Sequence, residues 1–210
     1  MHAPCNTLAK KSLALFDFDG TLYLGDSFTR FIFYALDKQH ILIQGLKTAP
    51  WIKGYFLNLY AAPDMRKRLF SAMFAQKDAL EIQKLGHAYA LMLCEKLNPI
   101  LLAQLKQHQQ LNHDVVLVSA SLDIYLKPIC ELLNIQLICS KPEIKDGLYT
   151  GHYAVDDCSG FLKKQSVLKQ YNLDDYENIY AYGNSHEDVE MLSLANYPYM
   201  VGKDKVLPCL

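Results

Sequence analysis

Two aspartates, Asp17 and Asp19, stand one residue apart at the end of an apolar run and directly before Gly20. The run, residues 13–16, is typical of a buried parallel strand that ends in a turn. Open α/β sheets carry their chemistry at the carboxyl ends of the strands, and side-chain alternation along a strand would point both carboxylates the same way. Because two like charges repel, such a pair predicts a bound cation or phosphoryl chemistry.

Further polar residues stand at the ends of other predicted elements. They are Ser119 after the run at 115–118, Lys163 and Lys164 at the start of a helix, and Asn184 with Asp188 after the run at 179–182. The carboxyl ends of neighbouring parallel strands meet at one edge of a sheet. We therefore expect these side chains to gather around the two aspartates.

The order of the predicted elements indicates an α/β fold. From residue 98 onward, short apolar strands alternate with helices, which is the pattern of a Rossmann-like, doubly wound parallel sheet. Residues 23–97 show helical periodicity without a strand signal, so we expect an inserted α-helical cap there. The chain then divides into a core of residues 1–22 and 98–210 and a cap of residues 23–97.

Two local patterns refine this outline. Gly45, Pro50 and Gly54 interrupt the apolar positions of residues 41–60, which predicts broken helices in that part of the cap. The dipeptide Asp146-Gly147 stands between short flanks and predicts a hairpin turn.

The composition narrows the class of protein. A formal net charge of -1 over 210 residues gives no support for a nucleic-acid binder. The six cysteines are scattered, without a Cys-x-x-Cys pair, and are typical of cytosolic thiols. Residues 1–12 lack the apolar core of a secretory signal, and no window reaches the roughly 18 apolar residues of a membrane span. We therefore expect a cytoplasmic protein, and nothing in the sequence predicts its oligomeric state.

These residues together resemble the haloacid dehalogenase superfamily of phosphohydrolases. The first motif of that family, Asp-x-Asp-x-Thr, matches Asp17 to Thr21, and its second matches Ser119 after an apolar strand. Its third motif is a lysine, for which we prefer Lys163 over Lys164 because of its spacing from Gly160. Its fourth motif matches residues 183–188. The position of the predicted cap, between the first two motifs, is similar to that of the phosphoserine-phosphatase-like branch.

The resemblance implies a mechanism that these residue types can perform. Asp17 would attack phosphorus and form an aspartyl phosphate, while Asp19 would act as general acid and then as general base. Ser119 and Lys163 would bind the phosphoryl oxygens. Mg²⁺ would be held by Asp17, by the backbone that leads into Asp19, and by the loop of the fourth motif.

The loop of the fourth motif departs from the family pattern. Asn184 stands where the family usually has an aspartate, so this ligand has lost a negative charge and should hold Mg²⁺ less tightly. We expect Asp188, in the same loop, to compensate as a further metal ligand, either directly or through water.

The sequence thus predicts a phosphatase, a Mg²⁺-dependent phosphomonoester hydrolase whose partner is a small phosphorylated metabolite. Two alternatives stay open. Aromatic residues beside Lys47 and Lys53 permit a cap that touches lipid, and thus a lipid-headgroup (phosphatidylglycerophosphate-like) phosphatase at a membrane surface. The asparagine at position 184, where the family usually has an aspartate, permits a non-catalytic phosphate-binding regulatory module. We interpret the basic cluster at residues 66–68 as a solvated face.

Overall fold

The computed structural model describes residues 11–210. Residues 1–10, including Cys5, lie outside the described residues. They make up most of the segment in which the sequence predicts no secretory signal. The α-helices are α1 (Ser27–Ala35), α2 (Lys38–Phe56), α3 (Ala62–Phe74), α4 (Ala79–Cys94), α5 (Pro99–Gln110), α6 (Asp123–Leu133), α7 (Gly160–Gln170) and α8 (Val189–Leu192). The strands are β1 (Lys11–Phe16), β2 (Asp114–Leu122), β3 (Gln136–Lys145), β4 (Leu148–Val155), β5 (Tyr176–Gly183) and β6 (Tyr197–Met200).

Within the described range, the strands form one six-stranded sheet in the order β4-β3-β2-β1-β5-β6. Every neighbouring pair is parallel except β3 and β4, which form an antiparallel hairpin. The central strand β1 therefore lies between β2 and β5, and the three strands end side by side. This topology confirms the α/β fold that the alternation of elements predicts.

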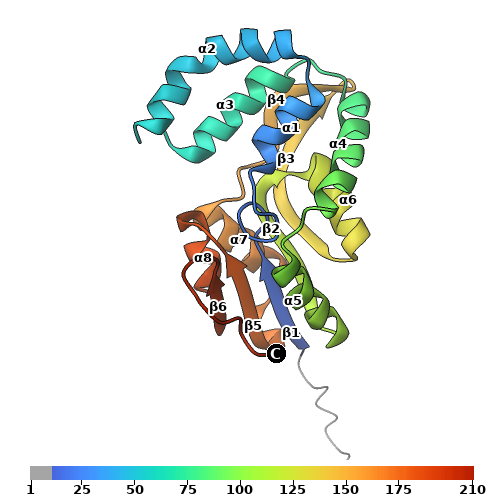
Figure 1. The fold of residues 1–210 in the computed structure, drawn as a ribbon, viewed down its shortest axis with the longest axis vertical. Helices are drawn as coiled ribbons and strands as arrows, with labels where there is room; N and C mark the ends of the chain where they lie inside the picture. The colour runs from blue at the N-terminus through green and yellow to red at the C-terminus, as the bar shows by residue number, and fades with distance from the viewer. Residues whose placement is uncertain (1–10) are drawn as a thin grey trace, which may run out of the picture.

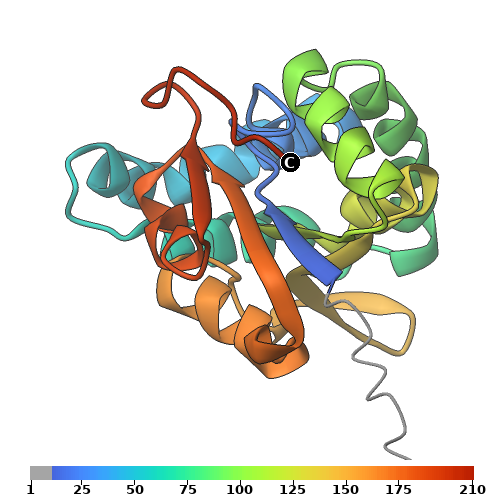
Figure 2. The same ribbon diagram turned by 90° about the horizontal axis from the view of Figure 1, so that it is seen from below.

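Both faces of the sheet are covered, as a doubly wound sheet requires (Figure 2). Side chains along β1 alternate between two cores: Ala14 and Phe16 belong to the core that includes residues of α5 and α6, whereas Leu13 and Leu15 belong to the core with residues of α7 and α8. All four side chains have no exposed surface. A strand buried on both faces explains why its sequence is continuously apolar rather than alternating.

The helices α1 to α4 occupy the chain between β1 and α5 and lie beyond the carboxyl ends of the central strands (Figure 1). The β3–β4 hairpin turns at Asp146 and Gly147, which both have positive φ (52° and 79°), as the dipeptide predicts. The hairpin also contacts the helices, because Gln76 donates its backbone N–H to the carbonyl of Tyr149 at 2.8 Å. The exact division into a core and a cap of residues 23–97 remains a proposal.

The expectation of broken helices in residues 41–60 is wrong, because α2 runs unbroken from Lys38 to Phe56. Its interior proline, Pro50, lies on the exposed side of the helix, where water can replace the hydrogen-bond donor that proline lacks. The hydroxyl of Thr48 bonds the carbonyls of Gln44 and Gly45, at 2.8 and 3.2 Å, which secures the preceding turn. Pro50 therefore does not interrupt α2.

The five cysteines that the structure describes are all free. Among residues 11–210, no helix is long and apolar enough to cross a membrane.

Candidate active site

The carboxyl ends of β1, β2 and β5 meet beneath the helices and form one wall of a cavity of about 250 Å³. Asp17 is fixed at this edge because its backbone N–H donates to the carbonyl of Tyr182 in β5 at 2.9 Å. Helices α1, α2 and α3 provide the opposite wall, which includes Phe28, Tyr55 and Met65. The cavity thus has a polar floor from the sheet and a largely apolar roof from the helices.

Asp17 is almost completely buried and has a hydrogen-bond donor at each carboxylate oxygen. Its Oδ1 accepts from Lys163 Nζ at 2.6 Å, and its Oδ2 accepts from the Thr21 hydroxyl at 2.9 Å. Burial raises the pKa of Asp17, and the Lys163 ammonium opposes that rise. Thr21, the last residue of the first motif, therefore helps to hold and orient the carboxylate.

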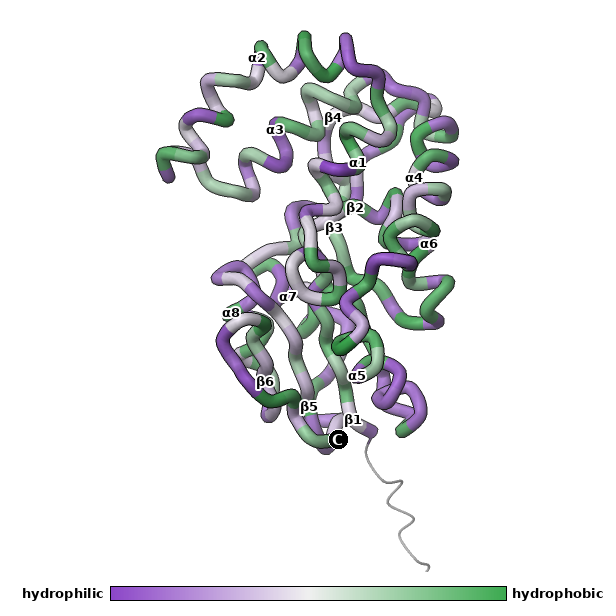
Figure 3. Tube along the Cα trace, in the orientation of Figure 1, coloured by the Kyte–Doolittle hydropathy of each residue, from purple (hydrophilic) through white to green (hydrophobic). Residues whose placement is uncertain are grey.

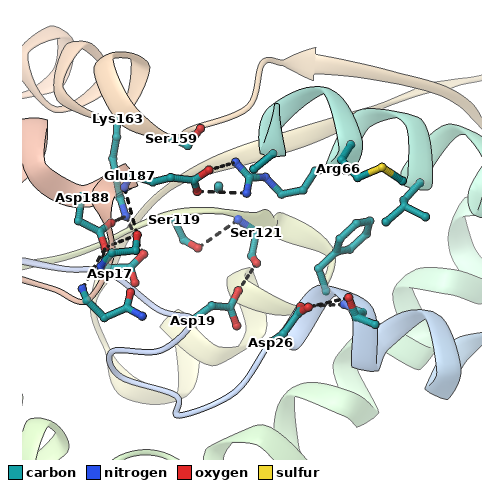
Figure 4. Close-up of a pocket in the computed structure, with 18 of the residues that line it drawn as sticks. Asp17, Asp19, Asp26, Arg66, Ser119, Ser121, Ser159, Lys163, Glu187 and Asp188 are labelled. Carbon is teal, nitrogen blue, oxygen red and sulfur yellow. Dashed lines mark hydrogen bonds and ion pairs between the residues drawn. The ribbon is translucent and has the colours of Figure 1, made fainter. Parts of the chain in front are cut away.

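The structure distinguishes the two candidate lysines. Lys163 is 2% exposed and bonds both Asp17 and Asp188, at 2.6 and 2.5 Å, so it lies on the floor of the cavity (Figure 4). Burial alone would lower the pKa of Lys163, but the two carboxylates raise it, so the side chain stays charged. Lys164 instead reaches Glu190 at 3.2 Å on the surface, outside the residues that line the cavity.

Asp19 has surroundings quite unlike those of Asp17. Its Oδ1 accepts from the backbone N–H of Ser27 at 2.7 Å, and its Oδ2 accepts from the hydroxyls of Ser27, at 2.9 Å, and Ser121. Burial raises the pKa of Asp19 to about 7, although these hydrogen bonds act in the opposite direction. Burial thus raises the pKa of both aspartates, but only Asp17 has an ammonium against it, and Asp19 can exchange a proton near neutral pH.

The loop after β5 is folded around Asp188. Asp188 Oδ2 accepts from the backbone N–H groups of Asn184 and Ser185, at 3.0 and 2.9 Å, while its Oδ1 accepts from Lys163. Burial would raise the pKa of Asp188, but the lysine charge and the backbone hydrogen bonds lower it, so the carboxylate stays ionised. Asp188 thus fixes the loop and the lysine, and both of its oxygens are already engaged.

Asn184 brings its amide close to the first motif. The Thr21 hydroxyl lies 3.4 Å from Asn184 Oδ1 and 2.9 Å from Asp17 Oδ2, so these two oxygens converge on one point. The approach requires Gly20, whose φ is +77° and where a Cβ would stand 1.9 Å from Asn184 Nδ2. Carboxylate and amide oxygens are donors that suit Mg²⁺, so this donor set fits the ion.

The remaining predicted ligands contribute less to such a site. The Asp19 carboxylate is held by Ser27 and Ser121, which leaves its backbone as the part of the residue available to an ion. Among residues 11–210, no group of three or more His, Cys, Asp or Glu side chains could hold a metal. This is consistent with the amide at position 184, because one expected acidic ligand is missing there.

Ser119 lies in β2 and lines the cavity, buried to 2% exposure. The strand continues past it to Leu122, and the pairing register with β3 shifts between Ser119 and Leu122. Ser121, two residues further on, donates its backbone N–H to the Ser119 hydroxyl at 3.1 Å and its own hydroxyl to Asp19. The strand end therefore serves both the predicted phosphate site and the predicted acid.

The basic cluster at residues 66–68 is not simply a solvated face, because Arg66 points into the cavity from α3 (Figure 4). Its guanidinium bonds Asp157 through two hydrogen bonds of 2.7 and 2.9 Å and also bonds Glu187 at 3.1 Å. Asp157 precedes α7 and Glu187 adjoins Asp188, so Arg66 ties a helix of the roof to the floor. Sequence reasoning missed this contact because its partners are 91 and 121 residues away.

Sequence reasoning also missed the roles of Ser27 and Tyr125 beside Asp19. The Ser27 hydroxyl lies 3.1 Å from the Tyr125 hydroxyl, and the Tyr89 hydroxyl donates to the Ser27 carbonyl at 3.0 Å. The run Asp26-Ser27-Phe28 carried a signal, since a polar pair soon after the first motif must lie near the cavity. The two tyrosines gave none, because buried tyrosines are ordinary core residues.

Comparison with known proteins agrees with this arrangement. A model of the haloacid dehalogenase-like hydrolase family matches residues 14–193. A histidinol-phosphatase of Neisseria meningitidis serogroup C is 25% identical over 94% of this chain and 93% of its own length. A structure of a protein of unknown function from Bordetella pertussis superposes with a TM-score of 0.71 and 21% identity, over 90% of this chain and 89% of the other. A structure of a phosphoserine phosphatase, solved as a phospho-aspartyl intermediate analogue, superposes with a TM-score of 0.58 and 20% identity. The match covers 91% of this chain and 86% of the other.

The chain is therefore a member of the haloacid dehalogenase-like hydrolase family. The solved phosphoserine phosphatase shares the fold of this chain.

Proposed function

We propose that the protein is a Mg²⁺-dependent phosphomonoester hydrolase that works through an aspartyl phosphate on a small phosphorylated metabolite. The observation that supports this most directly is the contrast between Asp17, paired with a buried lysine, and Asp19, whose pKa is raised to about 7. A nucleophile whose carboxylate form is favoured by an adjacent ammonium and a second carboxyl that can carry a proton are the two groups that such a reaction needs.

In the first half-reaction, an Asp17 oxygen attacks phosphorus and the bond to the leaving oxygen breaks. Protonated Asp19 gives its proton to that oxygen, so the product leaves as an alcohol. In the second half-reaction, ionised Asp19 takes a proton from water, and the water oxygen attacks phosphorus and releases Asp17. Asp19 returns to its protonated form and phosphate leaves, so the cycle closes without another reagent.

Lys163 and Ser119 bind the non-bridging phosphoryl oxygens. Lys163 is buried and charged, so it places a fixed cation beside the carboxylate that must approach an anionic phosphate. The Ser119 hydroxyl accepts from Ser121 and keeps its own proton to donate.

The residues that would hold Mg²⁺ are Asp17, through its carboxylate, Asn184, through its amide oxygen, and Asp19, through its backbone. Asp188 would support these ligands without binding the ion itself, because it fixes the loop of Asn184 and orients Lys163. A bound Mg²⁺ would reduce the repulsion between the nucleophile and the phosphate dianion.

A small substrate agrees with the size of the cavity, about 250 Å³, which leaves room for a phosphate group and a short leaving group. The named relatives are a histidinol-phosphatase and a phosphoserine phosphatase, and the substrates in both names are small phosphate esters. The cytoplasm remains the compartment that the cysteine pattern predicts.

Hydrolysis of p-nitrophenyl phosphate with Mg²⁺ tests the proposal. The wild-type protein should release p-nitrophenol, EDTA should stop the reaction, and Asp17→Asn should abolish it. Asp64→Asn is the matched control, because Asp64 is exposed in α3 and does not line the cavity.

A phosphoryl adduct trapped at acid pH on the peptide that contains Asp17 would support the covalent step. An inert wild-type protein on a broad panel of sugar, amino-acid, nucleotide and lipid phosphates would refute the enzymatic proposal and favour the non-catalytic phosphate-binding module instead.

A further inference from the structure

Helix α2 is the outermost element of the molecule and packs little of its own surface (Figure 1). Of its 19 residues only Thr48 is buried. Soluble proteins usually keep such a helix polar on its outer side. Figure 3 shows hydrophobic positions among hydrophilic ones along α2.

The most exposed apolar side chains of α2 share one face of the helix. At 100° per residue, Leu42, Leu46, Ala49, Lys53 and Phe56 fall on one line along α2, with Ile43 and Pro50 beside it. We call these seven residues the outer stripe. All of them are exposed, Leu46 at 68% and Phe56 at 76%. The chain leaves the helix through Leu57 and Leu59, which are also exposed.

The opposite face of α2 explains why the stripe points outward. Thr48 is buried, Trp51 stacks against the Arg68 guanidinium at 4.0 Å, and Tyr55 lines the catalytic cavity. These inner contacts orient the helix. The apolar outer stripe is therefore a fixed feature of the folded protein, and it is larger than the scattered single apolar residues of an ordinary surface.

Charge identifies what would cover the stripe. Residues 38–60 contain Lys38, Lys47 and Lys53 and no aspartate or glutamate, although the whole chain has a net charge of -1. Lys53 stands within the stripe itself. A protein partner would have to bury this ammonium among apolar groups, whereas at a bilayer its long side chain can reach the lipid phosphates while its neighbours enter the acyl layer.

We propose that α2, with the segment to Leu59, docks the protein on an anionic lipid surface through its outer stripe. The helix would lie in the plane of the interface, with the exposed apolar side chains of the stripe toward the acyl layer and its lysines at the lipid phosphates. Since Tyr55 lies in the last turn of α2 and also lines the cavity, docking places the roof of the active site at the level of the lipid headgroups. The proposal goes beyond the hydrolase activity and does not depend on it.

Vesicle co-sedimentation of the full chain tests this directly. The wild-type protein should sediment with vesicles of equal parts phosphatidylglycerol and phosphatidylcholine, and at least tenfold less with phosphatidylcholine alone. Each lysine near an anionic surface contributes about fivefold to partitioning, so Lys47→Gln should weaken binding by about that factor. High salt should weaken it further.

The matched pair Leu46→Glu and Ile100→Glu separates the stripe from general surface effects. The two residues are exposed to nearly the same extent, at 68% and 64%, but Ile100 lies in α5 at the other end of the molecule. Leu46→Glu should reduce vesicle binding at least tenfold, and Ile100→Glu should change it less than twofold. Both variants should keep the wild-type circular dichroism spectrum and the wild-type rate on a soluble phosphate ester.

Three results would overturn the proposal. They are a wild-type protein that stays in the supernatant with anionic vesicles, equal loss of binding in both variants, and a stable dimer in sedimentation equilibrium that Leu46→Glu dissociates. The last result would show that a second copy of the chain covers the stripe.

Discussion

Replacement of Lys163 by methionine tests the contribution of its buried ion pairs with Asp17 and Asp188 to stability and activity. The variant keeps the length of the side chain but removes the ammonium that lies 2.6 Å from Asp17 and 2.5 Å from Asp188. All three side chains are at least nine-tenths buried. Two carboxylates would then face each other without a cation, and loss of one partner from a buried ion pair costs about 3 to 5 kcal/mol.

Lys164→Met is the matched control, because the next residue of the same helix pairs with Glu190 on the surface. Both partners are partly exposed, at 29% and 46%, and such a pair contributes about 0 to 1 kcal/mol. With a slope of about 3 kcal/mol per M urea, Lys163→Met should lower the unfolding midpoint by about 1 to 2 M, while Lys164→Met should change it by no more than about 0.3 M.

Urea unfolding followed by circular dichroism, in EDTA so that no divalent cation replaces the ammonium, measures both midpoints. On p-nitrophenyl phosphate, Lys163→Met should also lose about 10²- to 10³-fold in kcat/KM, and Lys164→Met should stay near the wild-type value. If the two variants had equal midpoints and equal activities, the assignment of Lys163 to the floor of the site would be refuted.

Two further outcomes are expected. Asn184→Asp adds a carboxylate beside Asp17 and should lower the Mg²⁺ concentration for half-maximal activity by tenfold or more; an unchanged Mg²⁺ titration would show that Asn184 is not a ligand. His108 is completely buried, and burial and the neighbouring His113 lower its pKa to about 3, so the folded protein cannot take up the proton that the unfolded chain binds below pH 6.5. Its contribution to stability is therefore present at pH 7 and falls by about 2 kcal/mol at pH 5. Urea unfolding at pH 7 and at pH 5 measures the loss of unfolding free energy between these two pH values. His108→Gln should make this loss about 2 kcal/mol smaller, whereas substitution of the exposed His87 should leave it unchanged.

The parts of the site that the sequence predicts are those encoded by short local patterns. Asp17, Ser119 and Asn184 each follow an apolar run, and a run of this kind must become a buried strand whose end lies at the active edge. Spacing favoured Lys163 over Lys164, and the burial and ion pairs of Lys163 support that preference.

The parts that sequence reasoning missed depend on tertiary contacts. The Arg66 interaction with Asp157 joins α3 to the segment before α7, and no local pattern couples positions so far apart. Broken helices were predicted around Pro50 because the residue breaks helices by default, and the prediction failed because the proline faces solvent. The raised pKa of Asp19 likewise arises from burial beneath the cap, which no single residue encodes.

The Arg66 tether has a kinetic consequence. The guanidinium is held by Asp157, which is 1% exposed, and by Glu187 in the loop that carries Asn184. Any motion of α3 away from the floor would separate these ions, so it would cross a barrier that the chemistry at Asp17 does not share. In an enzyme whose cap opened in this way, the rate of opening would set an upper limit on turnover, and because Asp157 is buried, salt would change that limit little.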